Sequence, residues 1–256
     1  TQFGGLINFV FKEPPNKKID AIIRNTIGSN NQYTNFTSIG GKKNKFSFYA
    51  FYNHKRGDGF RNNSNYKSNN VYVHLKQNLS NKSELSGEVT YMNYLAKQAG
   101  GLSDRMFINN PMQSNRSRNW FELDWLLYNF KFKHRFNEKT NLSFSLFGLD
   151  AERNTVGFRT NRVDQVDPLT ERDLIRGNFN NHGIELKILR KYKINEKKGT
   201  FVLGGKYYRS KSLSKQGPGS EGSDADFNIY LDEFPNYSNQ SNYIYPNKNF
   251  AFFGEN

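Results

Sequence analysis

The stretch 71–91, VYVHLKQNLSNKSELSGEVTY, carries the pattern on which the fold prediction rests. Apolar residues occupy every second position from Val71 to Leu75, and polar or aromatic residues stand between them. A turn composed of Ser, Asn, Lys and Ser follows at 80–83, and the alternation then resumes from Leu85 to Tyr91. Because successive side chains of a strand point to opposite faces, this stretch predicts a β-hairpin with one apolar and one polar face.

The same alternation recurs along most of the chain, and helical periodicity is almost absent. If the run beginning at Ile19 is strand 1, the connections after strands 2, 4, 6 and 8 are predicted to be short. Those after strands 3, 5, 7 and 9 are predicted to be long, and the short connection after strand 1 is an exception. Three long loops are expected at 97–118, at 154–179 and from the residues after Tyr207 to Pro246.

Loop parity favours an all-β fold, a transmembrane antiparallel β-barrel with long extracellular loops, because outer-membrane barrels have short periplasmic turns. No segment reaches the run of about 18 apolar residues that a transmembrane helix needs. A soluble β-sandwich has the same alternation with its apolar face inside, so the alternation alone does not separate the two folds. Aromatic girdles are expected from residues near strand ends, namely Tyr91, Tyr94, Trp120, Trp125, Tyr192, Tyr207 and Tyr208.

One predicted strand, 120–136, changes its hydrophobic phase in the middle. Phe121 to Leu127 are apolar in one phase, whereas Tyr128 to Phe132 are apolar in the other. A β-bulge near 126–128, or a strand that continues above the membrane, would account for the change.

Composition excludes several classes of chemistry. The chain of 256 residues lacks cysteine, which excludes disulfides, zinc–thiolate sites and a cysteine nucleophile. Its four histidines are far apart, and no catalytic motif is present, so we expect no enzyme, no cofactor and no resident metal. Four acidic residues of one predicted loop do not match a calcium-binding motif, and a solvated loop is the simpler interpretation: Asp164, Asp167, Glu171 and Asp173.

The net charge is +14, from 37 Lys and Arg against 23 Asp and Glu. A basic chain rich in Phe and Tyr is compatible with binding of single-stranded nucleic acid. Here the basic residues are spread over loops and turns instead of gathering on one surface, which disfavours that function.

Five segments resemble the TonB-dependent outer-membrane receptors, and together they span the whole chain. GGLINFVFK at 4–12 resembles the strand that closes the plug domain of these receptors, and HKRGDGFR at 54–61 resembles an early barrel loop. Three further segments resemble the ferric citrate receptor subgroup: AGGLS at 99–103, NPMQSNRSRNWF at 110–121 and NFAFFGEN at 249–256.

The resemblance implies a division of the chain into three parts. Residues 1–13 would be the end of the plug, 14–17 a linker, and 18–256 the N-terminal half of the barrel. Such receptors have a plug and a barrel of about 22 strands, so about ten strands would be present here. The expectation is therefore a fragment that lacks most of the plug and the energy-coupling box. The segment 6–11 is expected to lie in the lumen and not in the barrel wall, because Pro14 and Pro15 interrupt pairing after it.

The resemblance also implies a function and partners. The receptors import a scarce ferric chelate across the outer membrane of a Gram-negative bacterium, and the TonB energy-coupling complex acts on their plug. Expected partners are a ferric chelate such as ferric citrate, the TonB complex, outer-membrane lipid and lipopolysaccharide, but not nucleic acid. Two alternatives stay open, a passive pore or structural barrel and a soluble β-sandwich binding module. The plug-like segment argues against the pore, and loop parity argues against the sandwich.

Loop arginines are the predicted ligand-binding residues. Guanidinium groups form bidentate, charge-assisted hydrogen bonds with carboxylates, and ferric citrate complexes are rich in carboxylates. Contact with lipopolysaccharide phosphates, or simple solvation, is the alternative role for each of them. The predicted set is Arg116, Arg118, Arg56, Arg61, Arg105, Arg159, Arg162 and Gln113, with Arg172 as a further loop arginine outside it.

Overall fold

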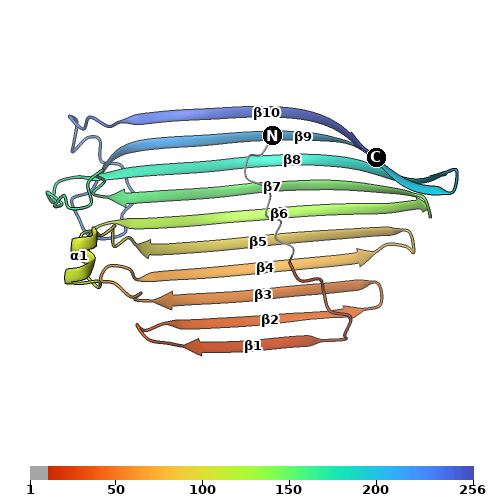
Figure 1. Ribbon diagram of the computed structural model, residues 1–256, viewed down its shortest axis with the longest axis horizontal. Helices are drawn as coiled ribbons and strands as arrows, with labels where there is room; N and C mark the ends of the chain where they lie inside the picture. The colour runs from red at the N-terminus through yellow and green to blue at the C-terminus, as the bar shows by residue number, and fades with distance from the viewer. Residues whose placement is uncertain (1–10) are drawn as a thin grey trace.

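Residues 11–256 form one antiparallel sheet of ten strands, placed side by side in chain order (Figure 1). The computed structural model describes residues 11–256. Within them the single helix is α1 (Asp104–Asn109), which confirms the all-β prediction. The strands are β1 (Asp20–Ile27), β2 (Tyr33–Lys43), β3 (Phe46–Gly57), β4 (Tyr66–Asn78), β5 (Ser83–Lys97), β6 (Trp120–Asn137), β7 (Thr140–Gly157), β8 (Arg172–Ile194), β9 (Lys197–Gly219) and β10 (Ser241–Glu255).

Short and long connections lie at opposite ends of the sheet, as the sequence predicts (Figure 1). The turns after β2, β4, β6 and β8 are short, at 44–45, 79–82, 138–139 and 195–196. The loops after β3, β5, β7 and β9 are long, at 58–65, 98–119, 158–171 and 220–240. Asn44 has a φ of 54° in its two-residue turn, a left-handed conformation that Asn tolerates better than most residues.

The apolar face of the sheet is exposed, whereas a soluble sandwich would bury it against a second sheet. We call outer the face that bears Ile23, Val71, Leu146, Ile184 and Phe252, and inner the face that bears Ser38, Tyr72, His74, Ser86 and Ser145. On the outer face Ile184, Leu186 and Ile188 are 42%, 46% and 40% exposed, whereas the inner Ser145 is buried. Apolar side chains outside and polar ones inside are the arrangement of a barrel wall in lipid.

Strand β6 pairs with β7 without interruption through the phase change. The register is continuous from Trp120, opposite Val156, to Arg135, and shifts only between Arg135 and Asn137. The predicted bulge near 126–128 is therefore wrong, and the alternative of a strand that continues beyond the apolar band holds. Towards the long loops the outer positions become polar, at Glu122 and Asp124, while the inner positions become apolar.

Two loops are shorter than predicted for the same reason. Strand β7 continues to Gly157 and β8 starts at Arg172, so the loop between them is 158–171 and not 154–179. Strands β9 and β10 leave only 220–240 between them. Beyond the apolar band both faces of these strands carry polar residues, so the alternation that marks a strand in the sequence is lost.

The alternation also corrects the predicted aromatic girdles. Tyr91, Trp120, Tyr192 and Tyr207 share the outer face with the apolar band. The prediction is wrong for Tyr94, Trp125 and Tyr208, which lie on the inner face because they occupy the opposite phase of their strands.

Residues 11–19 cross the inner face of β2–β4 before β1 begins (Figure 1). The Phe11 ring stacks on Tyr72 with 4.4 Å between ring centroids, and the Lys42 backbone N–H donates to the Lys17 carbonyl at 2.7 Å. A Cβ at Gly40 would lie 2.7 Å from Pro15 Cδ, so this approach requires glycine. The prediction for 6–11 falls, except for Phe11, outside the described residues. The boundaries 1–13, 14–17 and 18–256 stay predictions.

Within residues 11–256, no helix is both long enough and apolar enough to cross a membrane.

Candidate functional site

The long loops are joined to one another at one end of the sheet. The Asn62 backbone N–H donates to the Met112 carbonyl at 3.0 Å, which links loop 58–65 to loop 98–119. The Asn115 side chain donates to the Val163 carbonyl and links loop 98–119 to loop 158–171. Three of the predicted arginines make further links between these loops, with backbone carbonyls and, for Arg118, also a carboxylate as acceptors.

Arg61 holds loop 58–65 against loop 98–119. Its Nη1 donates to the Gly100 carbonyl at 2.7 Å, and its Nε and Nη2 donate to the Gln113 carbonyl at 3.0 and 2.9 Å. Gln113, another predicted ligand residue, uses its side-chain amide to donate to the carbonyl of Met106 within α1. Both residues therefore contribute to the fold of the same loop.

Arg116 is buried between loops 98–119 and 158–171. Its Nη1 donates to the Asn115 and Gln165 carbonyls at 2.6 and 3.1 Å, and its guanidinium lies 5.0 Å from the centroid of the Phe158 ring. A cation over an aromatic face is favourable, more so when it is removed from water.

Arg118 forms a buried bidentate pair with Asp167, a residue 49 positions away. Its Nε donates to Oδ2 at 2.9 Å and its Nη2 to Oδ1 at 2.5 Å. Its Nη1 donates to the carbonyls of Thr170 and Glu221 at 3.0 and 2.8 Å, so this one side chain joins three loops. Burial alone would raise the pKa of Asp167, but the hydrogen bonds from Arg118 and from the Leu169 backbone outweigh it and lower that pKa.

Arg172, at the start of β8, is fully buried although it was not part of the predicted ligand set. Its Nη1 donates to the Asp224 carbonyl at 2.7 Å and its Nε to the Ser220 carbonyl at 2.9 Å. It also donates to the carbonyl of Arg118 at 3.2 Å. Arg172 therefore fixes loop 220–240 to the pair described above.

The remaining predicted arginines are exposed. Arg105 lies on α1, and Arg159 and Arg162 lie on loop 158–171. We call Arg105, Arg159 and Arg162 the rim arginines. Arg162 reaches Asp164 at 3.3 Å, and it lowers the pKa of that carboxyl, with a smaller contribution from the charge of Arg105. Arg56 stands apart, because it shares the outer face with Tyr33 and lies 5.7 Å from the centroid of that ring.

The acidic residues of loop 158–171 and its flank do not converge. Asp167 pairs with Arg118, Asp164 with Arg162, and Asp173 accepts a hydrogen bond from Tyr237. Among residues 11–256 no group of three or more acidic or histidine side chains is placed to hold a metal ion.

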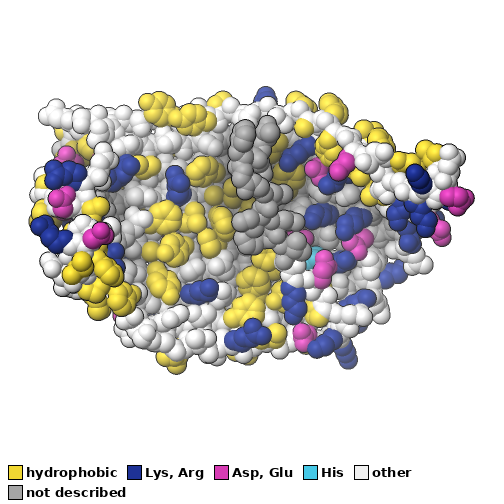
Figure 2. Space-filling view, in the orientation of Figure 1, with side chains coloured by type: hydrophobic (Ala, Val, Ile, Leu, Met, Phe, Trp, Pro, Cys, Tyr) yellow, Lys and Arg dark blue, Asp and Glu magenta, His cyan; other side chains and the backbone are white. Residues whose placement is uncertain are grey.

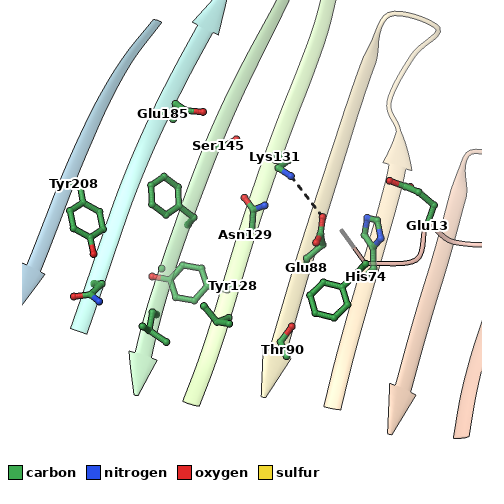
Figure 3. Close-up of a pocket in the computed structure, with 16 residues that line it drawn as sticks. Glu13, His74, Glu88, Thr90, Tyr128, Asn129, Lys131, Ser145, Glu185 and Tyr208 are labelled. Atoms are coloured by element: carbon green, nitrogen blue, oxygen red, sulfur yellow. Dashed lines mark ion pairs between the residues drawn. The ribbon is translucent and has the colours of Figure 1, made fainter. Parts of the chain in front are cut away.

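A second polar feature, which the sequence analysis did not single out, is a hollow of about 670 Å³ on the inner face (Figure 3). Glu13, Glu88, Lys131 and Glu185 lie around it, and Lys131 Nζ is 4.0 Å from a Glu88 oxygen. Charges of both signs continue towards the short turns, on the right in Figure 2. The signal was present in the sequence, since Lys and Glu occupy the polar phase of strands whose other phase is apolar.

Solved structures share this fold. No family model and no curated protein sequence matches the chain. The ferric citrate transporter FecA, in its unliganded form, superposes with a TM-score of 0.73 at 16% identity, over 97% of this chain and 38% of FecA. The ferripyoverdine receptor of the outer membrane of Pseudomonas aeruginosa superposes with a TM-score of 0.70 at 12% identity, over 94% of this chain and 34% of the receptor. The RagAB peptide importer superposes with a TM-score of 0.57 at 12% identity, over 87% of this chain and 29% of the importer chain.

These comparisons define the fold as that of part of an outer-membrane receptor barrel. The chain spans less than two fifths of the length of each of these three structures, whereas most of the chain is matched in every case. The ten-stranded antiparallel sheet agrees with the fold expected from the resemblance to TonB-dependent receptors.

Proposed function

We propose that the chain is part of the barrel of an outer-membrane receptor that binds a ferric chelate at the cell surface and imports it with energy from the TonB complex. One observation carries this proposal. A single-layer sheet with an exposed apolar outer face and interlocked long loops at one end superposes over nearly its whole length on a ferric citrate transporter. Ferric citrate is the first candidate cargo.

The proposed setting follows from the two faces of the sheet. The outer face contacts lipid and lipopolysaccharide of a Gram-negative outer membrane, and the long loops face the cell exterior. The inner face, with its mixed charges, faces a plug domain whose last residues are 1–13. The TonB complex acts on plug residues that are not part of this chain.

The loop arginines take two roles in this proposal. Arg61, Arg116 and Arg118 hold the loops together, since their donors already meet carbonyl and carboxylate oxygens. Arg105, Arg159 and Arg162 are exposed on the rim, where a guanidinium can form a bidentate contact with a chelate carboxylate. Direct contact by Arg116, Arg118 and Gln113 stays a prediction, and Arg56 is the member of the set placed towards the membrane.

Ferric citrate binding to the full-length receptor in detergent tests this proposal. A hydrogen bond to a charged group contributes about 1.5–3 kcal/mol, so Arg105→Ala, Arg159→Ala or Arg162→Ala should weaken binding about tenfold where the contact is made. The matching Arg→Lys variant should recover part of the loss because the planar fork is absent. Lys139→Ala and Lys197→Ala, at the short turns, should bind as the parent does.

The outcomes separate cargo from function. Binding of another ferric chelate but not ferric citrate would exclude citrate as the cargo and would support the function as a ferric-chelate receptor. Binding of peptides alone would favour an importer of the RagAB kind, which shares the fold. Ferric citrate binding that is unchanged in all three exposed variants would overturn the role of the rim arginines.

A further inference from the structure

We propose that β9 and β10 bear, on the outer face, a site for a phosphorylated lipid headgroup in the leaflet on the long-loop side. The inference rests on the proposed placement in an outer membrane. Its core is Arg209, Lys211 and Lys248, three exposed basic residues directly beside the apolar band.

The register places these residues at the boundary of that band. The row Ile184, Tyr207 and Phe250 crosses β8, β9 and β10 on the outer face, with each residue paired to the next. Two residues further towards the long loops on each strand, the next outer row is His182, Arg209 and Lys248. The chemistry of the face therefore changes from apolar to basic within one row of residues on β9 and β10, and from apolar to polar on β8.

Arg209 and Lys248 are direct partners across antiparallel strands, so their Cα atoms lie about 5 Å apart. Lys211 follows Arg209 by two positions and points to the same face. No carboxylate lies within ion-pair distance of any of the three among the described residues. His182 is not part of the site, because its ring nitrogens are occupied by the Tyr128 hydroxyl and by the Asn180 side chain.

The neighbouring strands carry acidic residues at the same height, so the basic residues Arg209, Lys211 and Lys248 are confined to one part of the outer face. On β6 and β7 the outer positions above the band are acidic, at Asp124, Asp150 and Glu152. An anion at this height would therefore be repelled from β6–β7 and attracted to Arg209 and Lys248 on β9 and β10, whereas Lys211 lines the same hollow as Asp124, Asp150 and Glu152. The separation of charge around one girdle is not what simple solubility would require.

The shape of the site favours a lipid over free phosphate. Below Arg209 and Lys248 the Tyr207 and Phe250 rings pack with 4.6 Å between centroids. An acyl chain can lie on these rings while the guanidinium of Arg209 binds phosphate oxygens in a bidentate manner and the two lysines add charge. Inorganic phosphate would use only the upper half of the site.

Native mass spectrometry of the full-length receptor, titrated with bisphosphorylated lipid A, tests the proposal. A basic residue near an anionic lipid surface changes affinity by about fivefold, so R209Q, K211Q and K248Q together should weaken lipid A binding about a hundredfold. R209K should retain only part of the affinity, because the charge is kept and the planar fork is lost. The matched control is K139Q, K197Q and K198Q, which removes the same charge at the short turns and should bind lipid A as the parent does.

Four results would overturn the site. They are equal loss in the control variant, equal binding of dephosphorylated lipid A, displacement of lipid A by millimolar inorganic phosphate, and unchanged binding in the triple variant. Ferric citrate binding by the same preparations reports on the proposed function separately, because none of the three residues lies in the long loops.

Discussion

Replacement of Arg118 by alanine should open the long loops without unfolding the sheet. Arg118 belongs to loop 98–119 and contacts two further loops, loop 158–171 through Asp167 and Thr170 and loop 220–240 through Glu221. The variant leaves the Asp167 carboxylate without its guanidinium, in a position where the two side chains are only 5% and 9% exposed. It also leaves two backbone carbonyls without their donor.

The magnitude follows from the burial of the pair. Removal of one partner of a buried ion pair costs about 3–5 kcal/mol, whereas an exposed pair contributes at most about 1 kcal/mol. The loops lie near water, which can enter once they separate, so the lower figure of about 3 kcal/mol applies. A change of that size corresponds to about a 150-fold shift in the opening equilibrium.

Amide hydrogen exchange of the full-length receptor in detergent measures this equilibrium. Protection of the Leu169 and Tyr230 amides, which donate to Asp167 and to the Pro218 carbonyl, should fall about a hundredfold in Arg118→Ala. Protection within β8 should be unchanged. Arg162→Ala, which breaks an exposed pair, is the matched control and should leave all of these amides at the parent rate. Parent-like exchange at Leu169 in Arg118→Ala would refute the assignment of Arg118 as a loop clamp.

Three further predictions concern pH, backbone conformation and the outer face. The pKa of Asp167 is lowered from 3.8 in the folded protein. The ionised carboxylate therefore contributes fully to loop stability above pH 3.8, and this contribution is lost as the pH falls through the pKa of the folded state. Protection of the Leu169 amide should be constant above about pH 4 and decline below it. Gly100→Ala should lower loop protection about tenfold, because Gly100 has a φ of +77° and a Cβ there would lie 2.7 Å from Arg116 Cγ. Leu186→Arg should destabilise the full-length barrel in vesicles by about 2–4 kcal/mol in urea unfolding, whereas Lys187→Gln, on the inner face, should cost less than about 1 kcal/mol.

Much of the sheet could be predicted because its information is local. The alternation around Val71–Leu75 and the two-residue turn at Asn44 fix where strands lie and which way they face. The prediction failed where both faces of a strand are polar, as in the ends of β7 and β9 next to the long loops. There the sequence shows no alternation between apolar and polar residues, so the strand cannot be recognised from it. The phase change in β6 was visible in the sequence, but its cause required the register.

The candidate site could be predicted only in part. The loops and their arginines are evident from the sequence, yet the partners of those arginines are not. Arg118 forms hydrogen bonds with Asp167, 49 positions away, and with Glu221, 103 positions away, and no local sequence pattern predicts either contact. The segment 110–121 predicted ligand-binding arginines, and the structure shows that two of them, Arg116 and Arg118, are buried.

The carbonyl partners of Arg61 and Arg116 have a kinetic consequence. Unlike Arg118, neither has a carboxylate within ion-pair distance among residues 11–256, so each keeps its full positive charge inside the loop cluster. Their field extends beyond the distance of contact, and at physiological ionic strength it decays over about 8 Å. An anion can therefore be drawn towards the mouth by guanidinium groups that it never touches. The association rate and the lifetime of the bound anion would then depend on different arginines. Added salt would lower the association rate more than it shortens that lifetime.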